Sequence, residues 1–138
     1  MPQVTFADIQ VGQALPALVF DVSASAIVAG AMASGDFEVI HHDAPAARAR
    51  GTPDIFMNIL TTNGLVQRFV NDWMGPAGAI RAIALRLGVP SYAGATLRFE
   101  GSVVARHEGG AEHLVEVAVT GTNSLGEHVR ATVQVALP

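Results

Sequence analysis

Residues 97–135 read LRFEGSVVARHEGGAEHLVEVAVTGTNSLGEHVRATVQV, and apolar side chains recur along this segment at every second position. The alternation falls into three runs, over residues 97–103, 113–119 and 129–135. Two turn-forming sequences separate them, Gly109-Gly110 and Asn123-Ser124-Leu125-Gly126. A period of two, interrupted by turns, is typical of antiparallel strands that bury one face. The segment therefore predicts three consecutive antiparallel strands.

Two elements before this segment complete the predicted fold. Residues 79–89 alternate in the same way and predict a further strand. A long helix is predicted after Pro53, with Asp54 as its N-cap and Gly75-Pro76 as its end. Its apolar residues recur at spacings of three and four, at Ile55, Ile59, Val66, Phe69, Val70 and Trp73. One long helix followed by four antiparallel strands predicts an α+β fold in which the sheet wraps around the helix.

Shorter elements are predicted in the N-terminal part of the chain. They are an irregular segment over 1–16, a strand over 18–22, a helix over 26–33, a polar loop over 36–43 and a short segment over 45–50. Ser23 or Ser25 is the expected N-cap of that helix, and Gly35 is its expected end. Residues 61–64 of the long helix are Thr-Thr-Asn-Gly, which form helices poorly. Such small side chains predict close packing against a sheet, another subunit or a ligand.

The composition indicates one domain over residues 1–138 with part of its surface covered by a partner. Half of the chain is apolar and only 14% is charged, compared with roughly 25% in an average soluble domain. All eight basic residues are arginines. So few charges leave too little polar surface for a monomer, and we expect an oligomer.

Charge and residue usage exclude several classes of protein. The net charge is −4 and the pI about 5.6, so no basic surface for nucleic acid or an anionic membrane is expected. The chain has no apolar run of about 18 residues and no signal-peptide pattern after Met1. It also has no cysteine, which excludes disulfides, a thiol nucleophile and a thiolate metal site. A cytoplasmic protein is the expectation.

One cluster of ionisable residues stands out because such residues are scarce here. Residues 34–43 read SGDFEVIHHD and hold three carboxylates and two imidazoles. A carboxylate and an imidazole five residues apart on a turn can converge on one water molecule. The imidazole titrates near neutrality, and the carboxylate can orient it or share the proton transfer.

Three other interpretations of this cluster stay open from the residues alone. It is also compatible with a solvated polar loop. His-His-Asp resembles a set of metal ligands, although His107, His113 and His128 lack ligand spacing. A helix C-cap would explain Gly35 but none of the acidic residues.

The motif Ser34-Gly35-Asp36, followed five residues later by His41 and then by Asp43, resembles the hydratase motif of MaoC-like enoyl-CoA hydratases and dehydratases. These enzymes have hot-dog folds, in which a curved antiparallel sheet wraps a central helix, and the predicted layout is similar over nearly the whole chain. A closer similarity is to the catalytic subunit of heteromeric hydratases that act on steroid side-chain enoyl-CoA thioesters. That similarity is carried by residues 36–43, 54–60, 64–68 and 85–90.

The resemblance implies a catalytic pair, Asp36 and His41. The pair would hold a water against the β-carbon of a trans-2-enoyl-CoA and form the (R)-3-hydroxyacyl-CoA, or run the reverse dehydration. Which of the two removes the water proton stays open. No metal and no redox cofactor are implied, and CoA arrives as part of the substrate. Because these enzymes pair two hot-dog chains, we expect either a homodimer or a heteromer with a second hot-dog chain.

Substrate-binding residues follow from the same resemblance. The family uses the backbone amide of a glycine near the start of the central helix to stabilise the thioester carbonyl. The corresponding residues here are Phe56-Met57-Asn58, with Asn58 in place of the glycine, so Met57 and Asn58 are expected to bind substrate. Glu38 stands where the wider family has an asparagine that positions substrate or water, and it is a further candidate. Asp43 is expected to orient the loop or cap the next segment.

Two rival functions are weaker. A hot-dog acyl-CoA thioesterase would carry an acidic residue on the central helix, and residues 55–71 contain none. A non-catalytic acyl-CoA-binding partner subunit would not need both Asp36 and His41.

Overall fold

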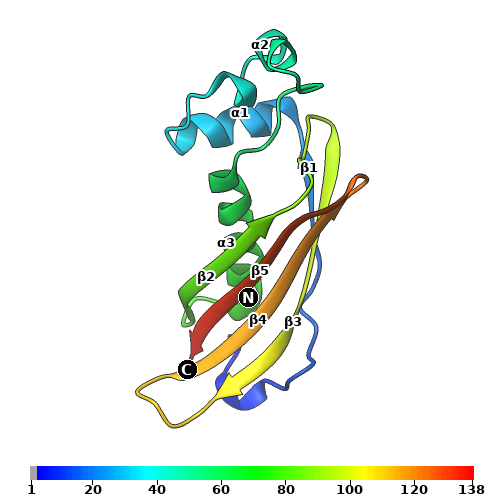
Figure 1. Cartoon of the computed structure of the whole chain (residues 1–138). Helices are drawn as coiled ribbons and strands as arrows, with labels where there is room; N and C mark the ends of the chain where they lie inside the picture. Colours follow the sequence, from blue (N-terminus) through cyan, green and yellow to red (C-terminus); the bar gives the residue numbers. More distant parts are fainter. Residues whose placement is uncertain (1–2) are drawn as a thin grey trace.

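The computed structural model describes residues 3–138, in which five antiparallel strands wrap along one long helix (Figure 1). The strands lie in the order β1-β3-β4-β5-β2 and span Leu18–Val22 (β1), Ala79–Leu87 (β2), Ala95–His107 (β3), His113–Asn123 (β4) and Gly126–Leu137 (β5). The long helix is α3, Ile59–Met74, and the shorter α1 (Ala24–Ala33) and α2 (Ala44–Ala49) lie beyond its N-terminal end. Two 3-10 turns complete the fold, η1 (Phe6–Asp8) and η2 (Val39–His41). The predicted α+β layout is confirmed.

The central strands β4 and β5 confirm the predicted alternation. Val117 lies opposite Val133 and Val119 opposite Ala131, and all four side chains are buried in the core. Thr132, between two of them, is exposed. The outermost strand β2 pairs along its length with β5, and its other edge carries no strand within residues 3–138.

The start of the long helix differs from the prediction. Helix α3 begins at Ile59, and its N-cap is Asn58, whose Oδ1 accepts a hydrogen bond from the Thr61 amide at 3.0 Å. Asp54 is therefore not the cap. Residues 55–57 are extended because they pair with a distant segment, through a bridge between Phe56 and Tyr92. Non-local backbone pairing thus delays the helix by one turn.

The two short helices begin at caps that the sequence predicts. Ser23 caps α1 by accepting a hydrogen bond from the Ala26 amide at 3.0 Å. Asp43 caps α2 in the same way through the Ala46 amide at 3.1 Å, which confirms its expected structural role. No helix within residues 3–138 is both long and apolar enough to cross a membrane.

Of the small residues predicted to pack closely within α3, Thr61 and Thr62 do so, whereas Gly64 is exposed with open space around it. A Cβ added to Gly30 of α1 would overlap the Thr61 side chain, so α1 crosses α3 at van der Waals contact there. One residue further on, the Thr62 hydroxyl lies 2.8 Å from Nε2 of the buried His128 on β5. Helix α3 is therefore fixed between α1 and the sheet near its N-terminal end.

Candidate active site

A helix C-terminus sets the position of Asp36. Gly35, with φ of 71°, ends α1 in the left-handed conformation that favours glycine. Its amide donates to the Met32 carbonyl at 3.1 Å, and the Asp36 amide donates to the Ala31 carbonyl at 2.9 Å. These two bonds form a Schellman motif. They fix the Asp36 backbone at the C-terminal end of α1.

The structure brings Asp36 and His41 together at the N-terminus of α3. The Asp36 Oδ2 atom and the His41 Nε2 atom are 3.5 Å apart. The His41 side chain is 9% exposed and the Asp36 side chain 25%, so the pair lies at the edge of the interior with one open side. This geometry allows a single water molecule to contact both groups.

The opposite nitrogen of His41 is held by the backbone. Nδ1 lies 2.7 Å from the Phe56 carbonyl oxygen, which can only accept, so Nδ1 carries the proton. In the neutral ring, Nε2 therefore presents a lone pair towards Asp36. The Phe56 ring packs edge-on against the imidazole, with centroids 4.9 Å apart. The extended conformation of residues 55–57 thus places the Phe56 carbonyl where it orients the His41 ring.

The Asp36 carboxylate is stabilised in its charged form. The hydrogen bond from Asn58 Nδ2 at 3.1 Å contributes most, followed by the Glu38 amide at 3.3 Å, and together with nearby His41 they hold the pKa of Asp36 below its ordinary value despite partial burial. Sequence reasoning did not find the Asn58 contact. The two residues are 22 positions apart, and only the packing of α1 against α3 joins them.

The three expected substrate-binding residues lie near this pair and differ in which of their hydrogen-bonding groups are already paired. The Met57 side chain is buried, and its amide already donates to the Ser91 carbonyl at 3.0 Å. The Asn58 backbone amide has no acceptor within residues 3–138, and the residue as a whole is buried. Glu38 turns its carboxylate to Arg50, at 3.0 Å, and both side chains are more than half exposed.

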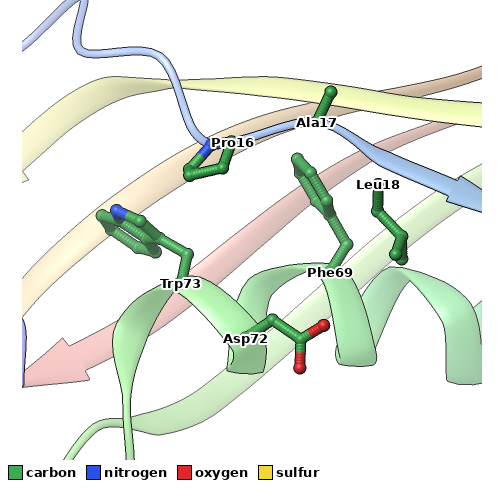
Figure 2. A pocket seen from close by; sticks show the side chains of 6 residues that line it. All are labelled: Pro16, Ala17, Leu18, Phe69, Asp72 and Trp73. Carbon is green, nitrogen blue, oxygen red and sulfur yellow. The ribbon is translucent and has the colours of Figure 1, made fainter. Parts of the chain in front are cut away.

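Two hollows differ in their relation to this pair. An open groove of about 350 Å³ runs between α1 and α3 beside Ser34, and its lining is largely apolar. A second cavity, of about 180 Å³, lies about 16 Å along α3 from Asn58 at the start of the helix. There Phe69 and Trp73 point towards Pro16 and Leu18 (Figure 2). The only ionisable residue lining that second cavity is the exposed Asp72, so it offers no acid–base pair. The described residues contain no group of three or more ligand-type side chains that could hold a metal ion.

Comparison with known proteins shows the family of the chain. The family model described as the MaoC like domain matches residues 10–124 of the chain. The chain belongs to the MaoC-like domain family. The matched range includes Asp36, His41 and the whole of α3.

Individual MaoC-like relatives support the assignment. The chain is 49% identical, over 92% of its own length and 95% of the relative's, to a protein of Mycobacterium tuberculosis named 3-oxo-4,17-pregnadiene-20-carboxyl-CoA hydratase beta subunit. It also matches a chain in the crystal structure of the ChsH1-ChsH2 complex from the same organism, with a TM-score of 0.88 and 48% identity over 94% of this chain and 98% of that one.

A more distant structure agrees in fold. The R-hydratase PhaJ1 from Pseudomonas aeruginosa superposes with a TM-score of 0.87 at 21% identity, over 99% of this chain and 86% of that one. The predicted hot-dog fold and the resemblance to MaoC-like hydratases are therefore confirmed.

Proposed function

We propose that this chain is the catalytic subunit of an enoyl-CoA hydratase, with Asp36 and His41 as its catalytic pair. The observation that carries the proposal is the 3.5 Å approach of His41 Nε2 to Asp36 Oδ2 at the N-terminus of the central helix of a MaoC-like fold. The reaction is the reversible addition of water to a trans-2-enoyl thioester.

The protonation of the pair suggests how the proton moves. With the Asp36 carboxylate charged and the His41 ring in its neutral form, both groups accept hydrogen bonds, so one water can donate a hydrogen bond to each. His41 then removes a proton from the water as its oxygen attacks the β-carbon, and Asp36 stabilises the imidazolium. The same proton passes to the α-carbon, so the hydroxyl and the hydrogen of one water are both added. His41 acts as base and then as acid.

The thioester oxygen becomes more negative during this step and needs a donor. The free Asn58 amide supports the role that the resemblance assigns to this position, because it opens the helix at its positive end. The Met57 amide is less suited, because the Ser91 carbonyl already accepts its proton. No step of this scheme uses a metal or redox cofactor, and CoA is part of the substrate.

A second hot-dog chain is the partner that we propose. Ile59 and Leu60, next to the pair, are each 50% exposed, and Phe37 is 69% exposed. Ile59 and Leu60 also line a hollow of about 200 Å³ against Ile83 and Leu85 of the edge strand β2. A chain that extends the sheet at β2 would cover this apolar surface, which also accounts for the shortage of charge.

The names of the relatives suggest the substrate. One relative is named as a hydratase of a steroid carboxyl-CoA, and a matching structure is of a complex. We extend both properties to this chain: an acyl-CoA with a bulky polycyclic group as substrate, and a heteromer as the active form.

The proposal is tested by an activity screen on the full chain, alone and co-expressed with a candidate second hot-dog chain. Enoyl-CoA thioesters of increasing bulk are supplied, and hydration is followed by the loss of the conjugated enoyl absorbance. We expect hydration of bulky substrates in the presence of the partner. Release of CoA from saturated thioesters without hydration would instead identify a thioesterase, and inactivity in both forms towards all substrates would refute the catalytic assignment.

A further inference from the structure

We infer that the side chain of Asn58 is a positioning residue, which holds the Asp36 carboxylate against His41 while it caps α3. The inference deepens the proposed function and rests on it for the meaning of the pair. It concerns the carboxamide of Asn58, which is distinct from the backbone amide expected to bind substrate.

The hydrogen bonds of Asn58 leave its side chain no freedom to do anything else. The residue is 2% exposed. Its Nδ2 donates to Asp36 Oδ2 at 3.1 Å and to Ser34 Oγ at 3.0 Å, and its Oδ1 accepts from both the amide and the hydroxyl of Thr61. A carboxamide has two N–H donors and two acceptor lone pairs, and all four are used. The hydrogen bonds at its donor end and at its acceptor end therefore fix the orientation of the Asn58 carboxamide.

The acceptor end of Asn58 fixes its donor end. Because Oδ1 faces the amide of Thr61, Nδ2 points out of α3 towards the C-terminal end of α1, just beyond which Asp36 lies. The crossing at Gly30 holds Thr61 in place, with no space for a Cβ between the two helices. The position of the Asp36 carboxylate therefore depends on the crossing of the two helices, because Thr61 orients Asn58 and Asn58 binds Asp36. A glycine at position 58 could supply the backbone amide but neither of these side-chain bonds.

Few other charged groups face Asp36, so the contribution of Asn58 can be isolated. Residues 24–33 of α1 and 59–67 of α3 contain no ionisable side chain. From the loop, His41 lies 3.5 Å away, Glu38 pairs with Arg50, and the ring of His42 is bound to the Phe37 carbonyl at 3.1 Å. A change at position 58 that adds no charge should therefore act on Asp36 through the lost hydrogen bond.

Two substitutions separate positioning from helix capping. Asn58→Ser keeps a residue that caps helices well, but its shorter side chain cannot reach both Thr61 and Asp36. Asn58→Asp keeps the shape and the cap, removes the donor and places a second carboxylate beside the first. Ser23→Ala is the matched control, because it removes a helix N-cap, that of α1, without touching the pair.

The test has one readout that needs no catalysis and one that does. The Asp36 carboxyl is titrated by NMR in ¹³C-labelled full chain, with Asp36→Asn to assign its signal, and the pH profile of kcat is measured for the complex. We expect the Asp36 titration to move to higher pH in Asn58→Ser and further in Asn58→Asp, while thermal unfolding changes no more than in Ser23→Ala. Loss of kcat near neutral pH should be roughly tenfold or more, with KM little changed.

Each outcome decides the inference separately from the proposed function. A shifted NMR titration in an inactive protein would support the positioning role and refute the hydratase. An unchanged titration in both variants would overturn the positioning role even if the wild-type chain is an active hydratase. If Asn58→Ser does not fold, Asn58→Asp and its titration decide alone. A rise in KM with an unchanged titration would show that the side chain binds substrate instead.

Discussion

Replacing Thr62 by valine would remove one hydroxyl group from the interior while keeping the shape of the side chain. Thr62 is fully buried, and its hydroxyl lies 2.8 Å from His128 Nε2. The other ring nitrogen, Nδ1, lies 2.7 Å from the Val89 carbonyl and must carry the proton, so Nε2 is an acceptor whose only donor among residues 3–138 is the Thr62 hydroxyl. The substitution therefore leaves a lone pair without a donor in a site where His128 is 1% exposed.

The expected cost is that of an unsatisfied buried polar group, about 1–3 kcal/mol in the free energy of unfolding. Equilibrium urea unfolding measures it, with the fluorescence of Trp73, the single tryptophan, as the signal and the protein concentration held fixed. Thr132→Val is the matched control, because the same change on an exposed strand position should stay within about 0.5 kcal/mol of wild type. Equal stabilities of the two variants would refute the assigned network.

Two further predictions concern packing and pH. Gly30→Ala should destabilise the chain by about 1–3 kcal/mol in the same urea assay, because its Cβ would overlap Thr61. Gly64→Ala has open space around its Cβ and should stabilise the isolated chain by about 0.5–1 kcal/mol. The reverse order of stabilities would contradict the described crossing of α1 and α3. Burial lowers the pKa of His128 in the folded chain, outweighing the Val89 carbonyl, so the unfolded state binds the proton more readily. The free energy of unfolding should then fall as the pH drops below about 6.5, by at most about 1.4 kcal/mol per pH unit, and His128→Asn should lose this dependence. A slope that persists in that variant would assign it to other groups.

The sheet could be predicted from the sequence because its signal is local. Residues 113–119 and 129–135 alternate along their own length, and the turn between them joins neighbours in the sheet. The start of α3 could not be predicted in this way. Asp54 and Asn58 are both good helix caps, and the choice between them depends on the pairing of Phe56 with Tyr92, which lies 36 residues further along the chain.

The same contrast applies to the site. Asp36 and His41 are recognisable because they lie five residues apart in a chain poor in charge. Nothing in the spacing of residues predicts that the carboxamide of Asn58 reaches Asp36, since that contact depends on how α1 crosses α3. The orientation of His41 likewise depends on the Phe56 carbonyl, which the extended segment brings to Nδ1. Local pattern identifies the candidate pair, and tertiary packing determines the hydrogen bonds that hold each side chain.

The proposed function is tested most directly by the hydration rate of Asp36→Asn, His41→Asn and the double variant, each assembled with the partner chain. Both substitutions keep approximate size and lie outside the hydrophobic core, so circular dichroism should match wild type. The proposed pair predicts that each single variant loses about 10²-fold or more of kcat/KM. It also predicts that the double variant loses little beyond the worse single one, because the two groups act as a unit. Wild-type rates in either folded single variant would contradict the assignment of that residue to catalysis.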